Sequence, residues 1–214
     1  MLKVNSTKSF VNLPCGHAQH FDLEPDGSPG SCASVHGYDR TVKLTFSGTV
    51  DDNGWIVPFG ELKQVKTWLE YYFDHVTVLP ADDPRLDTIP ESMTGPGGIL
   101  GTLRVLPYGV SMEMSALFIW EHLNPFILSI TDSRCYISKV ESIEHERNTA
   151  FIEVDETTAR QQARKYATVR QAEGFLPKKP RWERMKPTQA LAGINDDSEL
   201  VNDFILGVMG MGKS

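Results

Sequence analysis

The clearest periodic pattern in this chain is an alternation of apolar and polar side chains over residues 41–50. A period of two places the apolar residues on one face, which predicts a β-strand with one buried side. Residues 51–54, two aspartates, an asparagine and a glycine, are typical of a turn. A short apolar run follows at 55–57. We interpret the two apolar segments as a hairpin-like pair.

Two segments follow the period of a helix instead. Residues 60–73 carry apolar side chains at spacings of three and four, which is typical of an amphipathic helix. A second helix is predicted over 111–123, with Ser111 as the N-cap and Glu113 in the first turn, where a negative charge complements the helix dipole. Asn124-Pro125 should end this helix, because proline cannot donate the helical hydrogen bond.

The remaining segments before residue 155 complete the predicted fold. Residues 81–109 are rich in proline and glycine and too long for a routine connection, so we expect them to cover a site or mediate assembly. Residues 126–130, 135–143 and 150–154 are predicted strands. The order strand, strand, helix, helix, strand, strand indicates an α+β fold.

The C-terminal part has a different character. Residues 157–172 favour a helix by propensity, and 177–182 are basic and proline-rich. Residues 200–209 carry an apolar stripe that predicts a short helix docked on this chain or on a neighbour. We therefore divide the chain into a domain over 1–154 and an extension over 155–214 that contacts an oligomer mate or another protein.

Composition narrows the class of protein. A chain of 214 residues suits one domain plus an extension, and its net charge of −7 argues against a general nucleic-acid binder, which needs a basic face. Three cysteines, an odd number, do not indicate a secreted disulfide framework. We find no signal peptide and no apolar run of the ~20 residues that span a bilayer. We expect a soluble, cytoplasmic protein.

Several sparse side chains could carry chemistry. His17, His20 and His36 are candidate zinc ligands, because a catalytic zinc needs three protein ligands and one open position. They could equally be separate, hydrogen-bonded histidines. Cys32, four residues before His36, is a candidate thiolate, although free cysteines are commonly buried and inert.

Two carboxylates complete the set of candidates. Asp74 directly precedes His75, and a carboxylate beside an imidazole can fix its tautomer and raise its basicity. The same pair could instead cap the end of the helix. Glu141 could accept two parallel N–H bonds from an amino-substituted heterocycle, or could be a solvated strand-end residue.

The order of these residues resembles the family of 6-pyruvoyl-tetrahydropterin and 6-carboxy-tetrahydropterin synthases across residues 8–154. The resemblance rests on His17 after an N-terminal strand, Cys32-x-x-x-His36-Gly37, the stretch Gly48 to Val57, Phe59-x-Glu61-Leu62-Lys63, Phe73-Asp74-His75, Ser111-x-Glu113 before Phe118-Ile119-Trp120, and Val140-Glu141-Ser142.

The resemblance implies a T-fold, which is a four-stranded antiparallel sheet with a helix pair between strands two and three. Such subunits join their sheets into barrels, commonly as hexamers, and closing a barrel removes exposed sheet edges. The implied substrate is 7,8-dihydroneopterin triphosphate. The implied product is 6-carboxy-tetrahydropterin, on the way to 7-deazaguanine compounds such as queuosine, with 6-pyruvoyl-tetrahydropterin as the alternative.

The resemblance also implies roles for individual residues. Zn²⁺ would bind His17 and His36, and Cys32 would be the proton-transfer thiol. Asp74 and His75 would form the acid–base pair. The pterin ring would be anchored by Glu141, with Ser111 and Glu113 also in the substrate site.

One position departs from the family pattern. His-Gly-His is expected, and this chain has His36-Gly37-Tyr38. A phenol with a pKa near ~10 is a poor ligand at neutral pH. The third ligand is therefore His20 or a phenolate of Tyr38, with His20 preferred. A further interpretation is that zinc is absent and the chain is a structural or assembly subunit.

Overall fold

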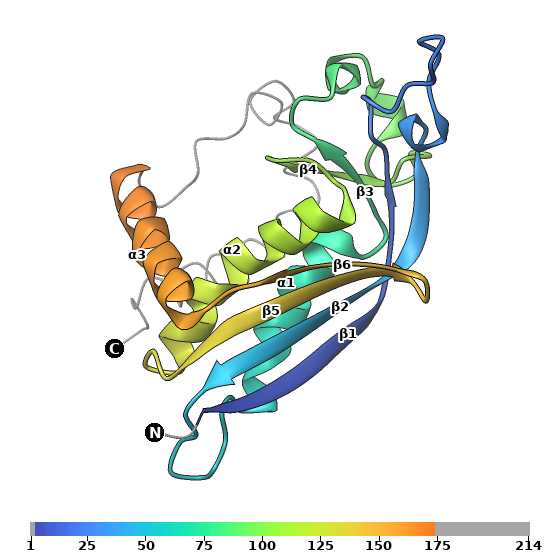
Figure 1. Cartoon of the computed structure of the whole chain (residues 1–214). Helices are drawn as coiled ribbons and strands as arrows, with labels where there is room; N and C mark the ends of the chain where they lie inside the picture. The colour runs from blue at the N-terminus through green and yellow to red at the C-terminus, as the bar shows by residue number, and fades with distance from the viewer. Residues whose placement is uncertain (1–2, 174–214) are drawn as a thin grey trace.

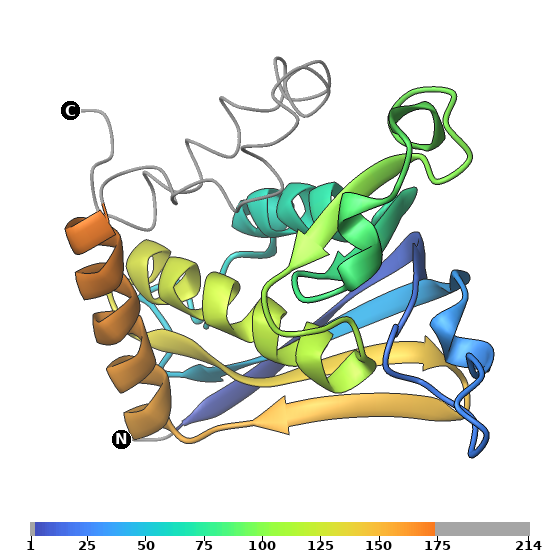
Figure 2. The ribbon, with the colours of Figure 1, turned by 90° about the horizontal axis from the view of Figure 1, so that it is seen from above.

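The computed structural model describes residues 3–173 of the chain; the predicted segments at 177–182 and 200–209 lie outside the described residues. One six-stranded sheet, in the order β4-β3-β1-β2-β5-β6, carries the helices α1 and α2 on one face (Figures 1 and 2). None of the described helices is both long and apolar enough to cross a membrane. The elements are β1 Val4–His17, β2 His36–Gly48, α1 Lys63–Phe73, β3 Val76–Pro80, β4 Thr102–Leu106, α2 Met112–Ile130, β5 Cys135–His145, β6 Asn148–Glu153 and α3 Glu156–Glu173.

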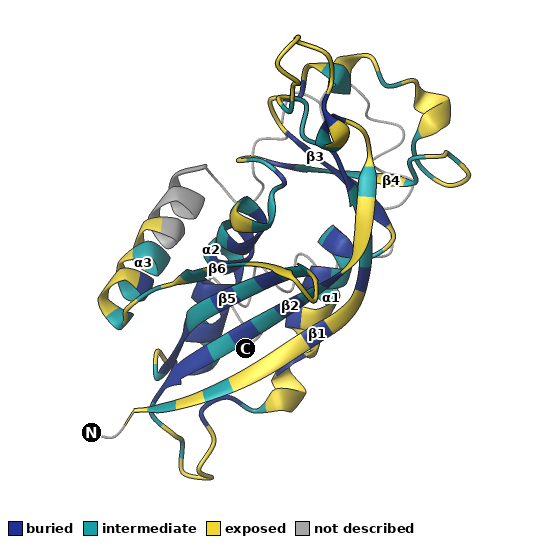
Figure 3. Cartoon of the chain, turned by 45° about the vertical axis from the view of Figure 1, so that its right-hand side comes forward, coloured by how far each residue is buried: buried dark blue, intermediate teal, exposed yellow. Residues whose placement is uncertain are grey.

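Four of the strands form the antiparallel sheet that the sequence predicts. β1 pairs with β2, β2 with β5 and β5 with β6, and the two predicted helices lie between the second and third of these strands in the chain. The apolar residues of β2 face α1 and α2 and build the core, whereas the other face of the sheet is more exposed (Figure 3). The α+β prediction is therefore confirmed.

The strand count differs from the predicted four. β3 and β4 run parallel to β1 and extend the sheet at one end, at the edges of the proline- and glycine-rich segment. All five residues of β3 are buried. A strand that is buried on both faces shows no period-two alternation, so its sequence looks like any short apolar run.

The predicted hairpin after β2 is wrong. β2 lies between β1 and β5, and residues 55–57 form no strand. Instead, the Asp51 carboxylate accepts hydrogen bonds from the backbone N–H groups of Asn53 and Trp55, at 2.9 and 2.8 Å. This side-chain-to-backbone turn satisfies the donors that a returning strand would have paired.

The helix α2 does not end at Pro125, so both the predicted stop and the predicted strand over 126–130 are wrong. A proline inside a helix leaves the carbonyl four residues earlier without its donor. Here that carbonyl belongs to Glu121, and it accepts a hydrogen bond of 2.9 Å from Nε2 of Gln162 on α3. A donor from another helix therefore replaces the missing one, and α2 continues to Ile130.

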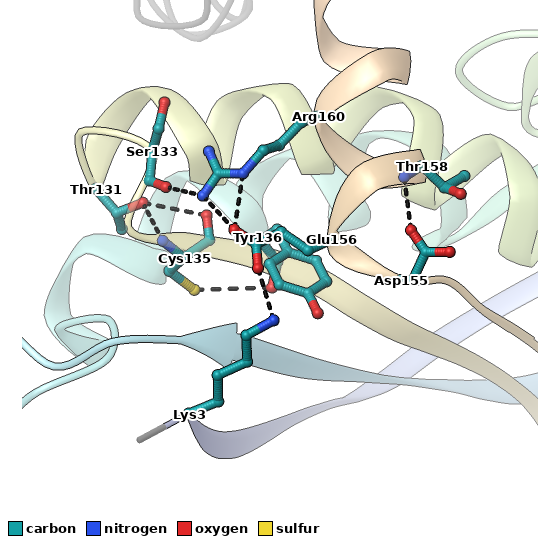
Figure 4. Close-up of polar contacts among 9 residues, drawn as sticks. All are labelled: Lys3, Thr131, Ser133, Cys135, Tyr136, Asp155, Glu156, Thr158 and Arg160. Atoms are coloured by element: carbon teal, nitrogen blue, oxygen red, sulfur yellow. Dashed lines mark hydrogen bonds and ion pairs between the residues drawn. The ribbon is translucent and has the colours of Figure 1, made fainter. Parts of the chain in front are cut away.

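The predicted helix over 157–172 is confirmed as α3, which packs on α2 and β5. Ala159 on α3 has no exposed surface and belongs to the same core as the sheet. At the start of α3, Glu156 accepts from Lys3 at 2.7 Å and pairs with Arg160, whose Nη2 also donates to the Ser133 carbonyl at 2.7 Å (Figure 4). The helix thus links the N-terminus to the turn after α2. The division of domains at residue 155 stays a prediction.

Candidate functional site

The ends of β1 and β2 bring two histidines together. His17 is the last residue of β1 and pairs in register with His36, the first residue of β2; their ring centroids are 4.3 Å apart. The neighbouring pair is Gly16 with Gly37. A Cβ on Gly37 would lie 2.6 Å from the Cys15 carbonyl oxygen. Glycine at position 37 therefore allows the two backbones to approach closely enough for the imidazoles to meet.

The two imidazoles are in different electrostatic environments. His17 is only 2% exposed, and its Nδ1 has no hydrogen-bond partner among the described residues. Burial, helped by the positive charges of Arg40 and His36, lowers the pKa of His17 to about 4. His17 is therefore neutral at pH 7. Nδ1 of His36 donates to the Ser34 carbonyl at 2.8 Å, which leaves its Nε2 available.

Tyr38 stands two residues further along β2, on the same face as His36. Its ring centroid is 6.1 Å from that of His36 and 6.4 Å from that of His17. It is also 5.8 Å from the ring of His145, at the end of β5. Sequence reasoning missed His145, because only the pairing of β5 with β2 brings the end of β5 to this place.

His20, the preferred third ligand, faces a different cluster. Its Nδ1 is 4.0 Å from Oδ2 of Asp83, a buried carboxylate held by Arg85 through contacts of 2.9 and 2.7 Å. Burial by itself raises the pKa of Asp83, but the hydrogen bonds and charge of Arg85 outweigh burial and hold that pKa below its usual value. Arg85 also donates to the Ala33 carbonyl at 2.5 Å. This cluster ties the Cys32 loop to the segment after β3.

Cys32 lies in a short 3-10 turn over Ser31–Ala33 and is half-buried. Its backbone N–H donates to Oδ2 of Asp22 at 2.8 Å, and its carbonyl accepts from the Gln19 N–H at 2.8 Å. These contacts fix the backbone and leave the thiol without a hydrogen bond among residues 3–173. The structure therefore fixes the backbone of Cys32, and its thiol forms no hydrogen bond with the other candidate residues, all of which are described.

Asp74 and His75 follow the end of α1 and are in direct contact. Oδ1 of Asp74 is 2.5 Å from Nδ1 of His75, and the imidazole is otherwise exposed. His75 has a φ of 52°, in the left-handed region, and its N–H donates to the Pro14 carbonyl at 2.8 Å. A left-handed conformation in a non-glycine residue is costly and marks a constrained position. The predicted acid–base pair is thus held beside β1.

A surface hollow of about 540 Å³ lies between His75 and the paired strands β1 and β2; His17, His36, Cys32 and Asp74 are not among its lining residues. Its lining includes His75, Tyr38, Cys15 and the loop that carries Ile99. Ile99 is 87% exposed, and its loop belongs to the segment predicted to cover a site. The hollow is in the size range of small-molecule sites.

The other predicted substrate residues lie elsewhere on the chain. Glu141 is on β5 between Lys43 and Lys139, each 3.4 Å from its carboxylate. Lys43, its cross-strand partner, is seven positions along β2 from His36, a distance of about 23 Å at the rise of a strand. Ser111 accepts from the Met114 N–H as the N-cap of α2, and Glu113 is exposed in the first turn. Within one chain, Glu141 is therefore too far from the histidine pair to contact the same ligand.

Comparison with known proteins identifies the family. The model of the 6-pyruvoyl tetrahydropterin synthase family matches residues 7–155, which is more than half of the chain. The chain belongs to this family. The resemblance inferred from the sequence is therefore confirmed.

Curated members of the family and solved structures agree with this assignment. The 6-carboxy-5,6,7,8-tetrahydropterin synthase of Rickettsia typhi is 30% identical over 71 residues, covering 32% of this chain and 51% of the relative. A probable synthase of the same name from Halobacterium salinarum is 29% identical over 87 residues, covering 40% of this chain and 50% of the relative. The chain thus spans about half the length of the curated relatives it matches.

Two solved structures show the fold of the family. An uncharacterised protein of Wolinella succinogenes has a TM-score of 0.59 at 20% identity, covering 72% of this chain and 100% of that chain. A 6-pyruvoyltetrahydropterin synthase of Plasmodium vivax has a TM-score of 0.54 at 19% identity, covering 72% of this chain and 99% of that chain. The predicted T-fold is therefore confirmed for this member of the family.

The donor set of this family member does not fit the expected zinc ion. Within residues 3–173, no group of three or more His, Cys, Asp or Glu side chains is arranged to hold a metal. His17 and His36 meet, and the buried, unpartnered Nδ1 of His17 could ligate. The Nδ1 of His20 is also buried without a hydrogen-bond partner, but it lies 4.0 Å from the Asp83 carboxylate and belongs to no group of three possible ligands among the described residues; Tyr38 is a phenol. The described residues supply two of the three ligands that a catalytic zinc needs.

Proposed function

We propose that this chain binds a pterin and acts as a lyase on 7,8-dihydroneopterin triphosphate. The expected product is 6-carboxy-tetrahydropterin, a precursor of 7-deazaguanine compounds, and 6-pyruvoyl-tetrahydropterin is the alternative. The observation that carries the proposal is the Asp74–His75 pair, whose Oδ1 and Nδ1 are 2.5 Å apart and whose imidazole lines the hollow together with Tyr38. The activity for which the curated relatives are named supports the choice of product.

The Asp74–His75 pair is suited to moving a proton. With the His75 Nδ1 proton directed at the Asp74 carboxylate, Nε2 keeps its lone pair and can accept a proton from a bound ligand. The carboxylate also stabilises the imidazolium that forms. Cys32 is the proposed second proton-transfer group, on a loop fixed by Asp22 and Arg85. No step of this proposal passes through a metal.

The position of Glu141 bears on how the site is assembled. At about 23 Å from the histidine pair along β2, Glu141 can anchor a pterin in this hollow only if a second copy of the chain supplies it. We therefore propose a homo-oligomer, with a hexamer as the expected form. The edge strands β4 and β6 are the places where sheets of neighbouring copies would join.

The test is turnover by the full chain. Purified protein is incubated with 7,8-dihydroneopterin triphosphate, with and without added Zn²⁺, and the pterins are separated and identified by mass spectrometry. We expect formation of a tetrahydropterin, slowed by about 10²-fold or more in Asp74→Asn and in His75→Gln. The matched control is Glu70→Gln on the exposed side of α1, which should leave turnover unchanged. Unaltered substrate under all conditions contradicts the proposal.

A second candidate function is a non-catalytic assembly subunit with a T-fold. The incomplete set of metal ligands favours it. Equilibrium binding of a dihydropterin separates the two candidates, because an assembly subunit should form the oligomer, as measured by light scattering, and bind no pterin. Binding without turnover supports a pterin-binding protein and excludes the assembly-only function.

A further inference from the structure

Arg40 is a buried charge on β2, four residues beyond His36. It occupies the same face of β2 as His36 and Tyr38 and is only 2% exposed. Its guanidinium carbon lies 4.8 Å from the centre of the Phe73 ring, at the end of α1. Among the described residues, its Nε and Nη1 have no hydrogen-bond partner. Burying a charged group in this way is costly unless the charge has a function or a partner.

The nearest acidic residue is engaged elsewhere. Glu144 lies on β5, one position beyond the cross-strand pair of Thr41 and Ile143 and therefore next to Arg40. Its carboxylate accepts from Nδ2 of Asn148 at 2.9 Å and is 3.8 Å from Nε2 of His145. In the part of the chain that the structure describes, no carboxylate forms an ion pair with Arg40. A guanidinium stays protonated at neutral pH, and the negative charge of Glu144 offsets it only through space, without an ion pair.

The charge of Arg40 acts on the histidine pair. The positive charge of Arg40 also acts on the thiol of Cys15, where it partly offsets the rise in pKa caused by burial; Cys15 lies two residues before His17 on the same face of β1. Arg40 is also one of the two cations that disfavour protonation of His17. The guanidinium of Arg40 and the imidazole of His17 are both buried, and electrostatic interactions between buried groups are much stronger than in water. The positive charge of Arg40 therefore opposes the binding of a metal cation at the imidazoles.

We infer that Arg40 and Tyr38 have converted the metal position of this family member into a metal-independent site, whose fixed positive charge is the buried guanidinium. Tyr38 removes one nitrogen ligand, and Arg40 supplies a charge that opposes Zn²⁺ and favours an anionic oxygen of a ligand beside His17. The identity of the ligand rests on the proposed function. The replacement of Zn²⁺ by the charge of Arg40 rests only on the residues of this chain. Arg40 acts through the potential at His17 and His36, so it is a positioning residue.

The test is a double-mutant cycle on zinc affinity. Zinc dissociation constants of the full chain are measured by competition with a chromophoric chelator for the wild type, Tyr38→His, Arg40→Met and the double variant. Methionine keeps a long side chain against Phe73 and removes the charge. Lys66→Met, which removes an exposed cation of α1, is the control for net charge. Co²⁺ absorption reports whether the bound metal is tetrahedral.

We expect weak zinc binding by the wild type and only a modest gain in Tyr38→His. Adding Arg40→Met to Tyr38→His should tighten binding by a further factor of at least about ten, and Lys66→Met should change it less than about twofold. If Arg40→Met does not fold, Arg40→Gln replaces it and should tighten zinc binding to the same extent. Arg40→Lys keeps the charge and should have the zinc affinity of the protein with Arg40.

Two results would overturn the inference. The first is a wild-type protein that is purified with one zinc per chain and loses it in His17→Ala. The second is equal zinc affinity in Tyr38→His with and without the Arg40 charge. Because no pterin is present, these results do not depend on whether the proposed reaction occurs.

Discussion

Asn124→Ala tests whether one buried amide holds α2, β5 and α3 together. Asn124 has no exposed surface. Its Oδ1 accepts from the backbone N–H of Ile137 on β5 at 3.1 Å, and its Nδ2 donates to the Ala159 carbonyl of α3 at 2.9 Å. A third contact, at 3.2 Å, reaches Gln162. The three elements therefore share one side chain.

The expected loss of stability follows from these contacts. Removing the amide leaves the Ile137 N–H buried without that partner, which costs about 1–3 kcal/mol, and each lost hydrogen bond to α3 costs about 1 kcal/mol. We therefore expect Asn124→Ala to lower the free energy of unfolding by about 3–5 kcal/mol. Asn124→Asp keeps the acceptor for Ile137 but directs a second oxygen at the Ala159 carbonyl, so it should cost at least as much.

The assay is urea unfolding at pH 7, followed by circular dichroism and by tryptophan fluorescence. The control is Asn53→Ala in the exposed turn after β2, which should change stability by less than about 0.5 kcal/mol. A loss in Asn124→Ala no larger than in the control would refute the reasoning, because it would show that α3 is not held by this amide.

Two further predictions concern the strand ends. Gly37→Ala should destabilise the protein by about 1–3 kcal/mol and reduce ligand binding, since the new Cβ would meet the Cys15 carbonyl at 2.6 Å. The control is Gly60→Ala, which should be tolerated because the added Cβ has no atom within 4 Å. Equal losses of thermal stability in the two variants would contradict the predicted clash at position 37. The pKa of His17 is lowered to about 4 in the folded chain, so the unfolded chain binds more protons between about pH 6.5 and 4, and stability should fall by about 2 kcal/mol on going from pH 7.5 to pH 5. His17→Gln should lack this component in urea unfolding at the two pH values, and an unchanged dependence on pH would contradict the assignment.

Much of the fold is legible in local patterns. The alternation in β2, the three- and four-residue spacing in α1 and the composition of α3 each predict an element that the structure contains. The errors arise where the decisive partner is distant in the sequence. A helix can continue through Pro125 only because Gln162 supplies a donor, and β3 is buried on both faces and so lacks a periodic signal.

Two contacts among the candidate residues were also predictable. The family resemblance implies that His17 and His36 lie together, and their rings are 4.3 Å apart; Asp74 and His75 are adjacent in the sequence and in contact. Arg40 was not among the predicted site residues, although the pattern of β2 indicates that it is buried. The alternation that buries Val42, extended back by two residues, also places Arg40 on the core side of β2. A charged residue at a position where the strand pattern requires an apolar one is therefore a candidate functional residue.

The hydrogen bond from Gln162 to the Glu121 carbonyl has a consequence for protein engineering. The family match ends at residue 155, so Pro125 lies inside the matched segment and Gln162 lies outside it. A chimera that joins residues 1–155 to the C-terminal segment of another family member would inherit the proline without its glutamine. The safe junction for grafting or shortening this protein therefore lies after α3 and not at residue 155, where the family match ends.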